Sequence, residues 1–368
     1  MQSHDYTLVA VDVSGIQDYV FRTNDLQHHL GASELVRRAT STWVRESLRT
    51  PNNMPRDDTL EDKRIEQGEV DAEVLYSGGG NVVILFATKC QATKFTRALT
   101  QKALLEAPGL NVTVASCPFA WRQGANDLGA TLSKLLGTDL RCKKRHGRAS
   151  GELLGLGVTA DCEFTGLPAV KRGGKENQRI SAEINAKLCG APLANARLKN
   201  EIGGEDYVYD FNEFGTRGES SYIAVIHTDG NRMGKRFEAL AQAGLPNRDY
   251  ILAVRALSNS VNQAAQAALH ATTDAIRQMP TQRTKRGSFS PYKNGKLLFR
   301  PIIFGGDDAT FVCDGRLGLT VAARYLEEFA KQELKTHDGD RKPTARAGIA
   351  IVKTHFPFGR ACIESPKN

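Results

Sequence analysis

A repeated order of expected elements constrains this chain of 368 residues more than any other feature. Short apolar runs rich in β-branched residues predict strands, and longer stretches with apolar residues at helical spacing predict helices. Each half gives the order strand, helix, strand, strand, helix, strand, which is the split βαβ pattern of ferredoxin-like folds. These elements lie at residues 6–13, 32–48, 74–77, 82–86, 89–107 and 110–115 in the first half, and at 222–227, 249–278, 297–304, 309–313, 317–334 and 345–352 in the second.

The two halves also share a double-glycine turn between their second and third strands. The first half has Gly78-Gly79-Gly80-Asn81, and the second has Gly305-Gly306-Asp307-Asp308. Glycine allows the positive φ angles that tight hairpin turns need. We interpret the chain as a duplicated domain with one acidic copy and one copy that has no carboxylates at its turn. Chance similarity of two βαββαβ stretches is the alternative.

The expected fold class is therefore α+β, with two ferredoxin-like domains joined by a small, mostly helical domain. We predict a first domain at residues 1–119, a connecting domain at 120–220 and a second domain at 221–368. Within the connecting domain, helices are expected at residues 125–136 and 179–188. The polar, basic stretch at residues 280–296 is expected to be a loop.

Composition and charge narrow the class of protein. The chain is 40% hydrophobic and 24% charged, has no apolar run near the roughly 18 residues of a membrane span, and begins without a secretion signal. We expect a cytoplasmic protein with no membrane partner. Lys and Arg exceed Asp and Glu by 8, which suits an anionic partner. The seven cysteines form no C-x-x-C pair, and the adjacent His28 and His29 are expected on the surface.

Carboxylates in the second half follow a pattern that predicts a metal site. Asp229 comes directly after an apolar strand, and Asp307 and Asp308 lie at the hairpin turn. Because the first and third strands of a βαββαβ sheet are neighbours, these acids should meet on one rim. Mg²⁺ and Mn²⁺ prefer such oxygen ligands. We expect Asp229, Asp307 and the backbone carbonyl of Gly230 to bind one ion, with Asp308 binding a second ion or shaping the first site.

Nearby residues predict a nucleotide beside this metal site. Gly305 and Gly306 would let a nucleotide approach the backbone, whose N–H groups bind phosphate oxygens. Lys235 and Arg236 are expected to neutralise a triphosphate, and the metal to activate a ribose hydroxyl for attack on phosphorus. An Asp after a strand is by itself usually a cap or turn residue, and a Gly-Gly-Asp-Asp turn alone can be a hairpin without function. Their occurrence together in one unit favours nucleotide chemistry.

These motifs resemble the large subunit of type III CRISPR effector complexes (the Csm/Cmr large subunit), which carries two palm domains. The first palm begins near residue 6, so no HD nuclease domain is expected before it. Cys162 and Cys189 have no partners for a zinc ribbon, and Asn231 stands where the family often has a second acid. The matching segments are DVSGIQDYVF at 12–21, GASEL at 31–35, GGG at 78–80, DGNRMGK at 229–235, GGDD at 305–308 and AGIAI at 347–351.

The resemblance implies that ATP is joined into cyclic oligoadenylate on two Mg²⁺ or Mn²⁺ ions in antiviral defence. The second palm would supply Asp229, Asp307 and Asp308 as the catalytic metal ligands. RNA or subunits of a CRISPR complex would be the trigger, and a separate effector would sense the product. The nucleotides would be held by Ser14, Gly78, Gly79, Gly80, Asn231, Lys235, Gly305 and Gly306.

Two other functions are compatible with a pair of palm domains. The first alternative is a catalytically silent pair that binds nucleotide or scaffolds an RNA-guided complex. The second is a template-dependent polymerase, which is disfavoured because no equivalent of fingers or thumb is evident in the sequence.

Overall fold

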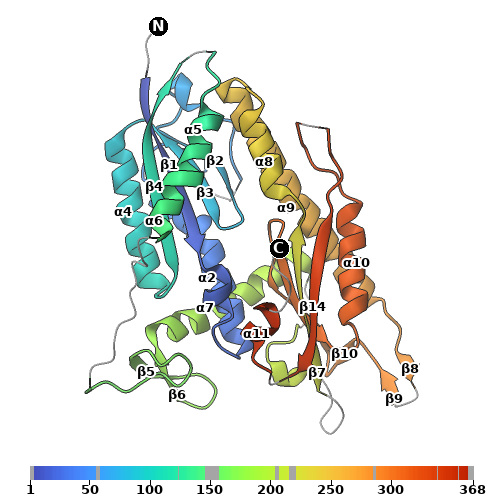
Figure 1. Ribbon diagram of the computed structural model, residues 1–368. Helices are drawn as coiled ribbons and strands as arrows, with labels where there is room; N and C mark the ends of the chain where they lie inside the picture. The colour runs from blue at the N-terminus through green and yellow to red at the C-terminus, as the bar shows by residue number, and fades with distance from the viewer. Residues whose placement is uncertain are drawn as a thin grey trace.

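A computed structural model describes residues 4–54, 59–122, 124–145, 157–203, 207–214, 221–284, 287–337, 339–354 and 356–363. Within them lie two four-stranded antiparallel sheets, with the strand orders β2-β3-β1-β4 and β12-β13-β7-β14. Figure 1 shows these sheets on opposite sides of the molecule. The identical order confirms the predicted α+β fold with two ferredoxin-like units.

The described elements of the first half agree closely with the expected order. In chain order they are β1 (His4–Ser14), α1 (Ile16–Val20), α2 (Leu26–Thr40), α3 (Thr42–Ser47), η1 (Ile65–Gln67), β2 (Ala72–Gly78), β3 (Asn81–Phe86), α4 (Lys89–Glu106) and β4 (Asn111–Trp121).

The second half repeats this order, with a longer helix between its first and second strands. Its main elements are β7 (Tyr222–Gly230), α8 (Met233–Gln242), α9 (Asn247–Arg277), β12 (Phe299–Ile303), β13 (Ala309–Asp314), α10 (Gly318–Ala330), β14 (Ala345–Lys353) and α11 (Phe358–Ile363). The expected loop at residues 280–296 was wrong in part, because it contains the short strands β8 (Gln282–Thr284), β9 (Gly287–Phe289), β10 (Tyr292–Lys293) and β11 (Lys296–Leu297).

The central strand of each sheet is apolar because it is buried on both faces. Residues 8–11 of β1 and 223–226 of β7 are almost completely inaccessible to solvent. A continuous apolar run, rather than an alternating one, is the pattern expected of a strand covered on both sides. Each central strand carries its polar residues at its end, so the rim of the sheet is where chemistry can be placed.

Helix α9 ties the two halves together. It packs against α10 of the second half and against β2 of the first. Glu73 on β2 is fully buried and accepts hydrogen bonds from Arg248 at 2.7 and 2.9 Å and from Arg255 at 2.6 Å. A buried carboxylate requires such partners, and removal of both arginines would leave its charge uncompensated. These contacts of α9 therefore link the two sheets.

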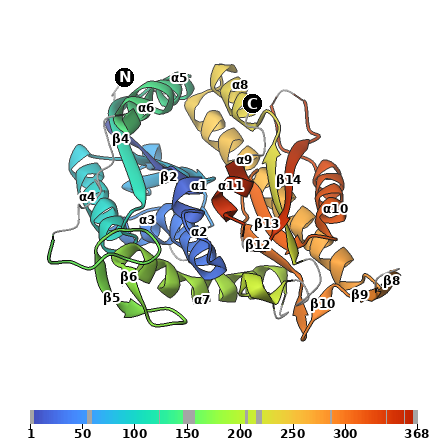
Figure 2. The same ribbon diagram turned by 60° about the horizontal axis from the view of Figure 1, so that its bottom comes forward.

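The connecting residues wrap around both halves. Helix α7 crosses α2 at Gly31 and Gly190, where a Cβ on Gly31 would lie 1.7 Å from the carbonyl oxygen of Lys187. Figure 2 shows α7 passing below α2 toward the second half. The predicted domain boundaries remain predictions. The connecting elements are α5 (Leu128–Lys134), the π-helix η2 (Leu135–Leu140), α6 (Arg141–Arg145), β5 (Ala169–Gly173), β6 (Gln178–Ser181) and α7 (Ala182–Ile202).

Two expectations about this part of the molecule were wrong. The helix expected to begin at Arg179 begins at Ala182, because the preceding residues form the β5–β6 hairpin. His28 and His29 are buried rather than on the surface, and the Nε2 atom of His29 lies 2.6 Å from the carbonyl oxygen of Thr23. Burial lowers the pKa of His29 to about 3 and that of His28 to about 4.

No helix among the described residues is long and apolar enough to cross a bilayer.

Candidate metal and nucleotide site

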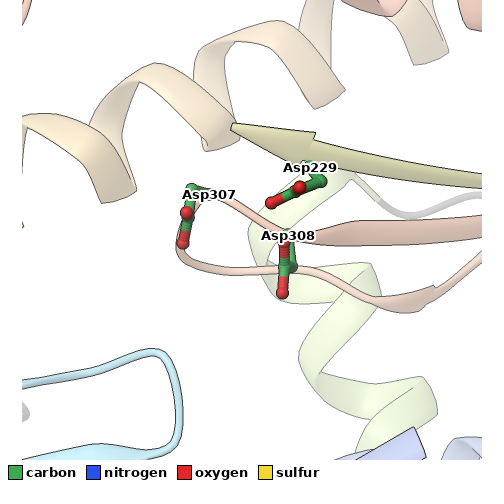
Figure 3. Close-up of side chains that lie close together, drawn as sticks. All are labelled: Asp229, Asp307 and Asp308. Atoms are coloured by element: carbon green, nitrogen blue, oxygen red, sulfur yellow. The ribbon is translucent and has the colours of Figure 1, made fainter. Parts of the chain in front are cut away.

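Three carboxylates meet at the rim of the second sheet. Asp229 is the penultimate residue of β7, and Asp307 and Asp308 lie in the turn between β12 and β13. Thr228 pairs with Ala309, so the register brings Asp229 and Asp308 side by side. One carboxylate oxygen from each of the three acids lies within 4.8 Å of the others (Figure 3). The structure thus brings together the acids that the sequence singled out.

Glycines make this approach possible. Gly305 and Gly306 have φ angles of +106° and +96°, which L side chains rarely adopt. Gly230 follows Asp229, and a Cβ there would lie 2.7 Å from the Cβ of Asp307. A side chain at Gly230 would therefore push the acidic turn away from β7. That Gly230 also supplies a carbonyl ligand remains a prediction.

The electrostatics of the cluster are those of a cation site. Burial raises the pKa of Asp307, and the charge of Asp229 adds to this rise. Desolvation, followed by repulsion from Asp307 and Asp229, raises the pKa of Asp308 to about 7. Carboxylates this close cannot all ionise without a compensating positive charge. An all-oxygen set of three carboxylates suits Mg²⁺ or Mn²⁺, so the residues fit the predicted metal.

Arg346 is a member of this site that the sequence interpretation missed. It is the direct partner of Asp229 across β7 and β14. Its Nε and Nη2 atoms donate hydrogen bonds of 3.0 and 2.6 Å to the same oxygen, Oδ2 of Asp229. The sequence signal was the antiparallel pairing of the first and last strands of the unit, but its register is fixed only by the folded sheet.

The glycine turns of the two halves lie close together at the edge of a cavity. Gly79 and Gly80 have φ angles of +59° and +81°, and a Cβ on Gly306 would lie 3.7 Å from the Cα of Gly79. In Figure 3 the light-blue hairpin of the first half lies beside the acidic turn. The cavity measures about 390 Å³, within the range of small-molecule sites. It is lined by Tyr76, Gly78, Gly79, Asn81, Leu136, Leu140, Met233, Gly234, Phe237, Ser258, Val261, Asn262, Gly306 and Asp307.

Several predicted nucleotide-binding residues do not line this cavity. Ser14 donates a hydrogen bond of 3.0 Å to Asp12 and borders a separate cavity beside Gly15. The side-chain amide of Asn231 donates to Thr344 Oγ1 at 3.1 Å. Lys235 is exposed on α8, and Gly80 and Gly305 also lie outside the lining. Their roles remain predictions.

Arg236 has a different role from the expected one. It is buried, and its Nη2 atom donates to Asp340 Oδ2 at 2.9 Å and to the carbonyl of Lys342 at 3.1 Å. This guanidinium therefore binds the segment that precedes β14. Its Nη2 atom is engaged there and does not point to a role in binding a triphosphate.

A larger cavity of about 1270 Å³ lies on the outer face of the first half. Its lining comes mainly from α4 and from residues 46–50, and it shares no residue with the cavity between the glycine turns. The three carboxylates do not border it. Size alone therefore does not mark the functional site.

Comparisons with known proteins support the interpretation of the second half as a palm domain. Residues 222–367 match the family described as Cas10/Cmr2, second palm domain. The chain is similar to the large subunit of type III CRISPR complexes. This confirms the resemblance drawn from the sequence motifs. No curated protein matches the chain.

Solved Csm1–Csm4 structures show the same fold over nearly the whole chain. A Csm1–Csm4 cassette in complex with cA4 has a TM-score of 0.58 and 16% identity, and covers 99% of this chain. A cassette in complex with AMPPNP has a TM-score of 0.58 and 17% identity, with 99% covered. The subcomplex of the type III-A CRISPR-Csm interference complex has a TM-score of 0.55 and 16% identity, with 98% covered. This chain spans about half of those chains, 52% in each case.

Proposed function

We propose that this protein joins ATP molecules into a cyclic oligoadenylate by metal-dependent nucleotidyl transfer. The observation that carries the proposal is the convergence of Asp229, Asp307 and Asp308 beside a cavity that the glycine turn of the first half also lines. The cassettes described in complex with cA4 and AMPPNP have the same fold, which supports nucleotide chemistry as the kind of function.

Each group of residues has a role in this proposal. Asp229, Asp307 and Asp308 would hold Mg²⁺ or Mn²⁺, which stabilises charge on the transferred phosphorus and lowers the pKa of the attacking ribose hydroxyl. The backbone N–H groups of the glycine turns would bind phosphate oxygens. Leu136, Leu140 and Phe237 give the cavity apolar walls suited to a base.

The chain's partners are also part of the proposal. The fold shared with the large subunit of Csm complexes suggests that other complex subunits and a target RNA control the reaction, and that a separate effector senses the product. The proposed setting is antiviral defence of the type III CRISPR kind.

The test is incubation of the 368-residue protein with labelled ATP and Mg²⁺ or Mn²⁺, followed by mass spectrometry of the products. We expect cyclic 3′–5′-linked oligoadenylate from the wild type and none from Asp307→Ala. Asp274→Ala, which removes an exposed acid on α9 outside the cavity lining, is the matched control and should retain activity. Nucleotide binding without product, even when RNA and Csm-type subunits are added, would favour the silent palm pair instead.

A further inference from the structure

Arg346 presents a cation to the acid cluster from the edge strand of the second sheet. Its guanidinium bonds to Asp229 Oδ2 through two nitrogens, and its positive charge also opposes the rise in the pKa of Asp308. The side chain is 48% exposed, so it has space to move toward solvent or ligand. Arg346 thus binds a carboxylate oxygen of Asp229, a residue that would also hold the divalent ion.

The duplicated fold does not require this arginine. In the first sheet, Asp12 occupies the register position of Asp229, and its partner on the edge strand is Thr113. Asp12 is instead paired with Lys144, which comes from α6 outside the sheet. An arginine on the edge strand therefore accompanies the three carboxylates and is absent from the half that has only one acid at this rim.

Charge and chemistry together define what the arginine can do. Two cations cannot share Asp229 without repulsion, so a divalent ion at the cluster weakens the hold of Asp229 on Arg346. A guanidinium forms paired hydrogen bonds to phosphate oxygens as readily as to a carboxylate. The polyphosphate of a nucleotide in the neighbouring cavity would offer such oxygens.

We propose that Arg346 is the resident counter-cation of the acid cluster and moves from Asp229 to the substrate polyphosphate when a divalent ion binds. The inference rests on the proposed function and adds to it a residue that couples metal binding to nucleotide binding. Arg346 opposes the metal in the absence of substrate and supports the substrate in its presence.

Two titrations on the full chain test this coupling in Arg346→Gln. The first measures Mn²⁺ alone by calorimetry, where loss of a competing surface ion pair should tighten binding about two- to fivefold. The second measures α,β-methylene-ATP, an analogue whose α–β phosphate bridge the proposed reaction cannot break, at saturating Mn²⁺, where loss of a charged hydrogen bond to phosphate should weaken binding about tenfold. Opposite signs in the two titrations are the expected result.

Controls separate this role from a purely structural one. Arg316→Gln removes a similar pair, in which Arg316 Nε lies 2.8 Å from Asp314 Oδ1 and the arginine is 50% exposed, and it should change neither titration. Arg346→Lys keeps the charge and should restore most of the analogue affinity. Thermal melting of each variant confirms that it is folded.

The remaining outcomes overturn the inference. If Mn²⁺ binds Arg346→Gln more weakly than the wild type, the arginine only orients Asp229; if both titrations are unchanged, it has no part in binding. In either case the proposed function stands, because the wild type still binds metal and nucleotide. If the wild type binds no Mn²⁺ and makes no product, the proposed function fails together with the inference.

Discussion

The rims of the two sheets have the same backbone and different charges. Asp12 of β1 pairs with Asn81 of β3, just as the register of β7 and β13 brings Asp229 beside Asp308. The first rim has a single acid, which Lys144 neutralises. The second rim has three acids and one arginine. The comparison teaches that the duplicated fold supplies the positions, while a few turn residues decide whether a rim can hold a divalent ion.

The largest expected effect comes from making the second rim resemble the first. The double variant Asp307→Gly/Asp308→Asn should reduce product formation by about 10³-fold or more, because it removes two carboxylates that would hold the metal. Product is measured by liquid chromatography with mass spectrometry.

The reverse change in the first half gives the control. Gly80→Asp/Asn81→Asp places acids at the other turn and should neither raise the wild-type activity nor rescue the inactive double variant. Rescue would mean that the two rims are interchangeable, contrary to the comparison.

A smaller loss is expected when the acidic turn is displaced rather than neutralised. Gly230→Ala would place a Cβ 2.7 Å from the Cβ of Asp307, so the turn must shift. A misplacement of this kind can cost about 100-fold in rate. The measurement is the initial rate of product formation. Gly137→Ala, at a position where a Cβ meets nothing within 4 Å, should keep full activity.

Crowding of carboxylates at the second rim should appear as a pH dependence of stability. The pKa of Asp308, about 7 in the fold, lies above its value of roughly 3.9 in the unfolded chain. The folded state therefore binds the extra proton, and the contribution of Asp308 to the free energy of unfolding falls as pH rises from about 4 to 7.

Urea denaturation in EDTA between pH 5 and 8 measures this effect. Because the buried His28 and His29 change stability in both proteins, the informative quantity is the difference between wild type and Asp308→Asn. We expect the wild type to lose stability relative to the variant as pH rises. Saturating Mn²⁺ should remove the pH dependence of this difference, and a difference that is independent of pH in EDTA would contradict the prediction.

The smallest effect is expected from the cation of the first rim. Lys144→Gln leaves the buried Asp12 without its ion pair and should lower the free energy of unfolding by about 1 kcal/mol, since Lys144 is itself partly exposed. Product formation should change little. The neighbouring Lys143→Gln, which loses only a hydrogen bond to the carbonyl of Val114, is the control.

The sequence predicted those parts of the molecule that have local signals. The apolar runs at residues 8–11 and 223–226 identified the central strands, and the shared glycine turns helped to identify the repeated order of elements. The convergence of Asp229 with Asp307 followed from the pairing of first and third strands. These features depend on short stretches of chain and on one topological rule.

Features that depend on long-range packing were not predictable in the same way. Arg346 joins the site through the register of β14, and Leu136 and Leu140 line the cavity from a π-helix in the connecting region. The ring of His29 packs against those of Phe211 and Phe358, which come from distant parts of the chain and whose centroids lie 5.7 and 4.7 Å from its own. No local pattern distinguishes such a histidine from one on the surface.

The hold of α9 on β2 has a consequence for how ligands enter and leave. A movement that separated the two sheets would pull Arg248 and Arg255 away from Glu73. The buried carboxylate would then have no positive charge beside it, which is costly. The ion pairs between α9 and β2 thus oppose any increase in the separation of the two sheets. Under the proposed function, entry of nucleotides and release of product would therefore depend on side chains and turns at the edge of the cavity.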